Sequence, residues 1–197
     1  MAKGKTFIIS GPSGVGKGTI VKALMESRDD VFLSVSATTR EPRTGEIDGV
    51  HYRFIDVERF RRLIEEDAFL EYAEYVGNFY GTPKKYVDEA MNAGKDVILE
   101  IDVQGAMQVS SKRPDAITIF VVPPSWAVLE QRLRDRGTDS EEKLQMRLVR
   151  AKVELQAASS YAYMVINDTV EEAVREVNAI MLAEHCRPSE RLEILSE

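Results

Sequence analysis

The chain has 197 residues, which is enough for one well-packed domain with inserted lobes and short for two independent domains. Hydrophobic residues make up 44% of the sequence and charged residues 30%, as in an ordinary globular protein. The formal net charge of −7 argues against broad electrostatic capture of nucleic acid, although a small anionic ligand needs only a local cationic pocket. The single cysteine, Cys186, excludes an intrachain disulfide and a multi-cysteine metal site, and we expect a partly buried, inert thiol in a reducing cytoplasm.

The first predicted unit is a strand over 5–10, a glycine-rich turn and a helix over 17–28. Glycines in the turn let successive backbone N–H groups point inward and form a concave anion site. The positive end of the helix and the Lys17 ammonium add to this site. The unit predicts binding of a nucleoside triphosphate such as ATP, with an ordinary strand-to-helix turn as the alternative. The residues expected around the phosphates are Gly11, Pro12, Ser13, Gly14, Val15, Gly16, Lys17, Gly18 and Thr19.

One position of this turn departs from the phosphate-loop pattern G-x-x-x-x-G-K-[ST]. Gly18 stands where a hydroxyl normally binds magnesium, and the hydroxyl follows at Thr19. Because the loop already begins at residue 11, we expect no secretion signal. No run approaches the ~20 apolar residues that cross a bilayer. We therefore expect a cytoplasmic protein with no membrane partner.

After a second predicted strand over 31–36, the segment 37–82 has a different character. It holds a turn-rich charged stretch, then an alternating run over 50–54, a short helix near 57–66 and further alternation over 69–76. Such alternation indicates antiparallel strands with one face solvated or lining a cleft. We expect an inserted mixed α/β lobe above the carboxyl ends of a parallel sheet, where the ligands of such sheets bind.

From residue 83 onward, helical patterns alternate with short β-branched runs. Strands are predicted over 95–101, 117–122 and 163–167, and helices over 83–93, 104–112, 125–136, 139–160 and 169–185. Thr138 and Glu141 predict a capping box at the start of the helix over 139–160. The fold predicted from this order is α/β, a P-loop three-layer doubly wound parallel sheet. Residues 126–140 predict a short helical lid.

Two acids end the predicted strand over 95–101. Glu100 and Asp102 are two residues apart, so both point to one face of the strand. Beside a phosphate loop, such acids hold Mg²⁺ directly or through water. The alternative is a helix N-terminus or a surface ion pair. Because Gly18 offers no hydroxyl, we expect the ion to depend on phosphate oxygens, water and these two carboxylates.

Arginines recur where the lobe and the lid are expected to face the cleft. A guanidinium binds phosphate oxygens through two parallel hydrogen bonds and stays charged at every physiological pH. For any single arginine, a solvated helix face is an equal interpretation. The candidates are Arg40, Arg43, Arg132, Arg136, Arg147 and Arg150.

Several of these segments together resemble the guanylate kinase family, in consistent order from about residue 4 to 185. The segments that carry the resemblance are 34–46, 49–54, 69–73, 77–82, 101–105, 132–133 and 136–138. The resemblance implies a domain over 4–185, with a core of 4–36, 83–125 and 141–185, a GMP-binding lobe over 37–82 and a lid over 126–140. The tail over 186–197 lies outside it.

The resemblance also implies a role for individual residues. It assigns the GMP phosphate to Ser36, Arg40, Arg43, Tyr52 and Tyr80, and the guanine to Glu71, Thr82 and Asp102. It assigns the triphosphate to Arg132, Arg136 and Arg147, and the neighbourhood of the adenine to Asn167, for which capping of a turn is an equal reading. Guanine presents N–H groups that can donate hydrogen bonds to carboxylates, whereas adenine presents a lone pair at N1. Such a site would reject adenine by ~10⁴-fold.

The activity implied is transfer of the γ-phosphate of ATP to GMP, with Mg²⁺ as cofactor. The groups expected to neutralise the transferred phosphoryl are Lys17, Arg40, Arg43, Arg132, Arg136 and Arg147. Two alternatives stay open: a kinase of another nucleoside monophosphate, and a non-catalytic module that binds phosphorylated partners. The intact loop with Lys17 speaks against the second. Self-association into a homo-oligomer is open as well.

Overall fold

The computed structural model describes residues 3–135 and 140–192, and its centre is a five-stranded parallel sheet with the order β2-β7-β1-β8-β9. All four strand pairs in this sheet run parallel, so the predicted doubly wound α/β architecture is confirmed. The strands are β1 (Thr6–Ser10), β2 (Val31–Leu33), β7 (Asp96–Glu100), β8 (Ile117–Val122) and β9 (Tyr163–Ile166).

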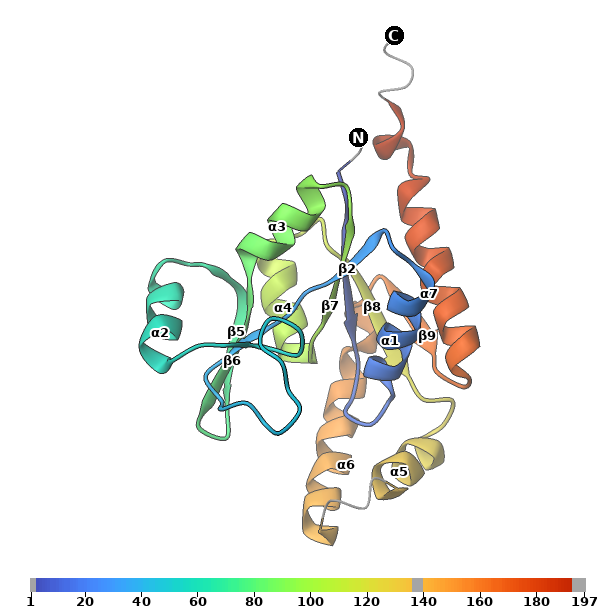
Figure 1. Ribbon diagram of the computed structural model, residues 1–197. Coiled ribbons are helices and arrows are strands. Elements are labelled where there is room, and N and C mark those ends of the chain that lie inside the picture. The colour runs from blue at the N-terminus through green and yellow to red at the C-terminus, as the bar shows by residue number, and fades with distance from the viewer. Residues whose placement is uncertain (1–2, 136–139, 193–197) are drawn as a thin grey trace.

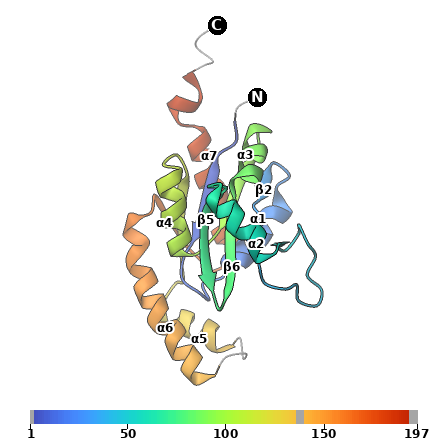
Figure 2. The ribbon, with the colours of Figure 1, turned by 90° about the vertical axis from the view of Figure 1, so that its left-hand side faces the viewer.

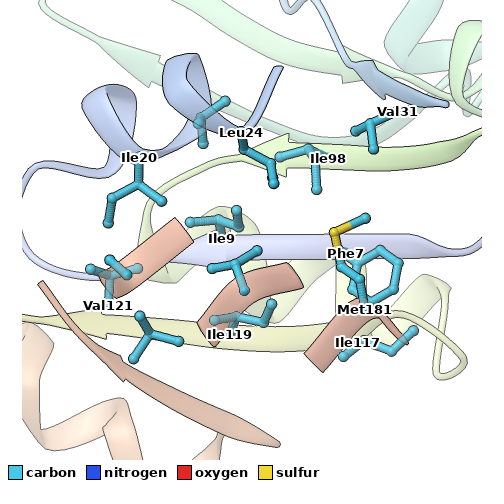
Figure 3. Close-up of a cluster of buried hydrophobic side chains, with 14 of the residues drawn as sticks. Phe7, Ile9, Ile20, Leu24, Val31, Ile98, Ile117, Ile119, Val121 and Met181 are labelled. Atoms are coloured by element: carbon cyan, nitrogen blue, oxygen red, sulfur yellow. The ribbon is translucent and has the colours of Figure 1, made fainter. Parts of the chain in front are cut away.

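Helices cover both faces of this sheet and make three layers (Figure 1). Alternate residues of the central strand β1 face opposite sides, since Phe7 and Ile9 belong to one apolar cluster and Ile8 to the other. Figure 3 shows the first cluster, which packs against α1 (Lys17–Ser27) and α7 (Val170–His185). The second cluster packs against α3 (Lys84–Asn92) and α4 (Val103–Lys112).

A second sheet, with the order β4-β3-β6-β5, lies beside the parallel sheet (Figures 1 and 2). Its elements are β3 (Ala37–Thr38), β4 (Arg53–Phe54), α2 (Val57–Glu65), β5 (Phe69–Tyr75) and β6 (Asn78–Pro83). Phe60 of α2 stacks on Phe69 and Phe79, with ring centroids 4.5 Å and 5.4 Å apart. The second sheet therefore has a small apolar core of its own.

The run over 50–54 was expected to form an antiparallel strand, and this expectation is wrong. Only Arg53 and Phe54 form β4, and they pair parallel with β3. The chain leaves β3 in a wide loop that returns to the beginning of that strand, where the Arg53 N–H donates to the Ser36 carbonyl at 2.9 Å. Such a return places the two strands in the same direction. The run over 69–76 does form an antiparallel strand, β5, which pairs with β6, and β6 in turn pairs antiparallel with β3.

The strand expected over 31–36 is shorter, because the chain crosses from one sheet to the other. The Ser34 N–H still donates to Ile98 O of β7 at 3.0 Å, whereas the Ser36 carbonyl already accepts from Arg53 of the second sheet. Residues 34–36 thus bridge the two sheets and leave Ser36 at the cavity between them.

Helices α5 (Trp126–Asp135) and α6 (Glu141–Leu155) extend beyond the carboxyl end of the parallel sheet (Figure 1). Leu129 and Leu133 of α5 pack with Leu144 and Leu148 of α6 in a separate apolar cluster. The Ser140 hydroxyl caps α6 by accepting from Lys143 N at 3.4 Å. The cap expected at Thr138, together with Arg136 and Gly137, lies outside the described residues.

The predicted helix over 139–160 ends earlier as an α-helix. A 3-10 helix, η1 (Gln156–Ser160), follows α6, and a second one, η2 (Pro188–Glu190), follows α7. Cys186 was expected to be partly buried and is instead exposed, because it follows the last turn of α7 at the molecular surface. Over the ranges 3–135 and 140–192, no helix combines the length and apolar character needed to span a bilayer.

Candidate active site

A cavity of about 550 Å³ opens at the carboxyl ends of β1 and β7, between the second sheet and α6. The loop after β1 contributes Gly11, Ser13 and Lys17. The other lining residues come from the second sheet and its approaches (Ser36, Tyr52, Glu71, Ala73, Glu74, Tyr75, Tyr80), the end of β7 and start of α4 (Glu100, Ile101, Asp102, Gln104), and α6 (Arg147, Arg150, Glu154). Polar groups from all three parts of the fold therefore meet in one space.

Two positions in the loop between β1 and α1 require glycine, because their φ is positive and other parts of the chain leave no room for a Cβ. Gly11 has φ of 145°, and a Cβ there would lie 2.3 Å from the Val121 carbonyl oxygen. Gly16 has φ of 94°, and its Cβ would lie 2.5 Å from Nδ2 of Asn167. That amide in turn donates to the Val15 carbonyl at 2.7 Å. The loop is thus held against the ends of β8 and β9.

Lys17 begins α1 and folds back over the loop. Its Nζ donates to the carbonyls of Gly11 at 2.6 Å and Pro12 at 3.2 Å. Burial lowers the pKa of Lys17, while the charges of Glu100 and Glu154 oppose the shift. The loop therefore holds a partly desolvated cation at the N-terminus of α1, where the helix dipole favours an anion.

The two acids at the end of β7 have different environments. Glu100 lines the cavity, and loss of hydration raises its pKa against the opposing charge of Lys17. A Cβ on Gly18 would lie 3.4 Å from Oε1 of Glu100, so this glycine leaves space beside the carboxylate. Asp102 caps α4 by accepting from Gly105 N at 2.9 Å, and its other oxygen accepts from Arg150 at 3.1 Å. Asp102 therefore fits the alternative to a magnesium ligand, because it caps a helix N-terminus and forms an ion pair.

Both acids line the same cavity, although β7 ends at Glu100 and Asp102 is the N-cap of α4, so the strand spacing does not account for it. Within the part of the chain that the structure describes, no three His, Cys, Asp or Glu side chains cluster tightly enough to hold a metal ion alone. A metal ion at Glu100 would consequently need further ligands from a bound phosphate or from water.

Glu71 forms the polar end of the cavity on the second sheet. Glu71 is only 7% exposed, and its Oε1 accepts from the Thr82 hydroxyl at 2.6 Å. Burial raises the pKa of Glu71, and the charge of Asp102 adds to the rise. A Cβ on Gly105 would lie 3.2 Å from Oε2, so α4 approaches the carboxylate closely. The arrangement is a fixed hydrogen-bond acceptor suited to a planar N–H donor.

Arg40 is held in place within the loop that joins β3 to β4. Its guanidinium donates to Oε1 of Glu46 at 2.8 Å and lies 5.4 Å from the ring centroid of Tyr52. Hydrogen bonds from Arg40 and then from the Arg43 backbone N–H lower the pKa of Glu46 to about 2. Tyr52 and Tyr80 line the cavity with their rings edge to face, 6.0 Å apart. Two tyrosines therefore line this side of the cavity, and Arg40 lies next to Tyr52 outside the lining.

The structure brings only some of the predicted cations to the cavity. Lys17 and Arg147 line it, whereas Arg40 and Arg43 lie outside the lining, and Arg43 is exposed. Arg132 also lies outside the lining, where it donates to the carbonyls of Asn167 at 3.0 Å and Val15 at 3.4 Å. Arg136 lies outside the described residues.

Arg150 and Glu154 are among the lining residues that the sequence did not identify as site residues. Arg150 had been noted only among recurring arginines, and Glu154 had not been singled out. Glu154 Oε2 accepts from the Ser13 N–H of the loop at 3.3 Å, and its Oε1 accepts from Arg150 at 2.7 Å. The available signal was helical spacing, because Arg147, Arg150 and Glu154 follow one face of α6.

Comparison with known proteins gives a consistent result. The family model described as guanylate kinase matches residues 3–184. Guanylate kinase of Clostridium perfringens (strain SM101) is 52% identical over 195 residues, covering 99% of this chain and 90% of the relative. That of Carboxydothermus hydrogenoformans is 50% identical over 188 residues, covering 95% and 92%. The crystal structure of guanylate kinase from Anaplasma phagocytophilum superposes with a TM-score of 0.74 at 32% identity, covering 95% of this chain and 89% of the other.

Proposed function

Because the chain belongs to the guanylate kinase family, we propose that it transfers the γ-phosphate of ATP to GMP and releases ADP and GDP. The observation that carries this proposal is that Lys17 and Glu71 line the same cavity. One end of the cavity offers a cationic phosphate loop, and the other offers a buried acceptor for the N–H edge of guanine.

In the donor half, the loop over 11–19 holds the triphosphate of ATP. Lys17 exchanges the carbonyls of Gly11 and Pro12 for phosphate oxygens. Arg147 already faces the cavity, and Arg132 and Arg136 approach when the lid closes. Asn167 lies beside the adenine. It also stabilises the loop, because its side-chain amide donates to the Val15 carbonyl. Positioning and charge neutralisation supply most of the rate enhancement in such a transfer.

In the acceptor half, the GMP phosphate is bound by Ser36, Arg40, Arg43, Tyr52 and Tyr80. Glu71, with Thr82 and Asp102, binds the guanine. The ionised Glu71 accepts from the ring N–H groups, whereas adenine would place a lone pair against it. A phosphate oxygen of GMP, which is already anionic near neutral pH, attacks the γ-phosphorus in line, so no general base is needed.

Mg²⁺ fits this site, because the carboxylate of Glu100 shares the cavity with Lys17 and has open space beside Gly18. Glu100 and Asp102 would hold the ion directly or through water, and the bound ion would neutralise charge on the phosphates. We assign the core to 4–36, 83–125 and 141–185, the GMP-binding lobe to 37–82 and the lid to 126–140. Closure of lobe and lid excludes water. We place this reaction in the cytoplasm.

Initial-rate assays of GMP, AMP, dTMP and UMP with Mg-ATP test the proposal. GMP should give the highest kcat/KM, and AMP in first place would overturn the acceptor assignment. Lys17→Ala should lower kcat/KM by about 10³-fold, as loss of a preorganised charge does. Lys22→Ala is the matched control, because Lys22 is an exposed lysine of the same helix, and it should retain wild-type activity.

A further inference from the structure

A chain of polar contacts crosses the cavity from the donor loop to the acceptor site. The Ser13 N–H donates to Oε2 of Glu154 at 3.3 Å, and Oε1 of Glu154 accepts from Nε of Arg150 at 2.7 Å. The other end of the Arg150 guanidinium donates to Oδ2 of Asp102 at 3.1 Å. Arg150 is thus shared between one carboxylate at the loop and one at the start of α4.

Glu154 places an anion where the phosphate loop would receive one. The Glu154 side chain is only 11% exposed, so its charge is poorly screened by water. Ser13 and Lys17 belong to the loop, and the charge of Glu154 acts on the Lys17 ammonium as well. A triphosphate that enters the loop has to displace the carboxylate from the Ser13 N–H, since two anions cannot share that donor.

We propose that Glu154 is a positioning residue that occupies the donor loop of the free enzyme, and that Arg150 couples its release to occupation of the acceptor site at Asp102. This inference rests on the proposed function. When guanine engages Asp102, Arg150 loses that partner and pairs more fully with Glu154. The carboxylate then leaves the Ser13 N–H more easily, so GMP strengthens ATP binding. By linkage, ATP strengthens GMP binding by the same factor.

The coupling has a functional consequence. ATP that binds alone has to compete fully with Glu154, whereas ATP that binds after GMP meets a carboxylate that is displaced more easily. The loaded donor site therefore forms mainly when an acceptor is present, which limits transfer of the γ-phosphate to water. Coupling of this kind falls within about 5- to 150-fold in affinity.

Calorimetric titration with the Mg²⁺ complex of β,γ-imido-ATP, with and without saturating GMP, tests the inference. Wild type should bind this analogue at least about fivefold more tightly with GMP present. Glu154→Gln keeps the shape and removes the charge. Without GMP it should bind the analogue about as tightly as wild type does with GMP, and GMP should then change its affinity less than about twofold. Glu142→Gln, an exposed acid in the first turn of α6, should behave as wild type.

Arg150→Gln provides the second variant. It leaves Glu154 at the loop and removes the connection to Asp102, so GMP should no longer raise affinity for the analogue. Unchanged or weaker binding by Glu154→Gln without GMP would overturn the role of Glu154. A full GMP effect in Arg150→Gln would overturn the coupling. A gain in affinity is not produced by misfolding. If wild type consumes no ATP in response to GMP, the proposed function fails, whereas an active wild type with the outcomes just named overturns only this inference.

Discussion

At the scale of single residues, Glu71 shows a conflict between stability and recognition. Burial raises its pKa above the value it has in the unfolded chain, so the folded state binds the proton more tightly. The contribution of Glu71 to the free energy of unfolding is therefore greatest below its unfolded pKa and is lost as pH rises through its folded pKa. Burial of the ionised carboxylate lowers the stability of the fold, and the hydrogen bond from Thr82 offsets part of this cost.

Glu71→Gln should separate these two effects. Loss of the charged acceptor should raise the KM for GMP by about 10- to 100-fold, with the KM for ATP near wild type. The midpoint of thermal unfolding at pH 7 should rise, because the buried charge is gone. In wild type, the KM for GMP should climb on acidification at a pH where an ordinary glutamate is still ionised. Equal loss of GMP and ATP binding would instead indicate a misfolded variant.

At the scale of elements, the hairpin between β5 and β6 has an unfavourable turn. Val76 and Gly77 join the strands with φ of 50° and 72°, the two positive values of a type I′ turn. Glycine tolerates this backbone, but a β-branched side chain does not. Val76 is 80% exposed, so burial does not compensate for its conformation.

Val76→Asn should stabilise the protein by about 1 kcal/mol, because asparagine tolerates a left-handed backbone far better than valine. Chemical denaturation would measure the change, with an unchanged denaturant dependence. Val50→Asn replaces another exposed valine, outside the positive-φ positions, and should alter stability by less than about 0.5 kcal/mol. A Val76→Asn variant no more stable than wild type would contradict the assignment of strain.

At the scale of the whole molecule, two small apolar clusters of the described residues lie apart from the two that cover the faces of the parallel sheet. Phe60 and Phe69 belong to that of the second sheet, and Leu133 and Leu148 to that of α5 and α6. Each part is thus able to move against the parallel sheet without losing its own packing.

Small-angle X-ray scattering should give a smaller radius of gyration with GMP and β,γ-imido-ATP together than with either alone. An unchanged radius would contradict closure of the lobe and lid.

Sequence patterns predicted what is local in the chain and missed what depends on distant contacts. The loop before Lys17 was predictable, because a strand, glycines and a helix follow one another within a short segment. The parallel direction of β4 was not, since no periodicity encodes how a wide loop returns. The bond between Ser13 and Glu154 joins residues 141 positions apart. Arg132 was expected among phosphates, and only the fold reveals its carbonyl partners.

The backbone carbonyls that hold Lys17 and Arg132 have a consequence for which ions the donor site admits. Both cations already have hydrogen-bond acceptors, so an incoming ligand adds few new bonds and replaces neutral acceptors with charged ones. The gain then grows with the valence of the ligand. A monovalent ion such as chloride gains little interaction energy with such cations, whereas a polyvalent chain of phosphates gains much. The backbone carbonyls that bind these cations therefore make the loop select polyvalent anions over monovalent ones.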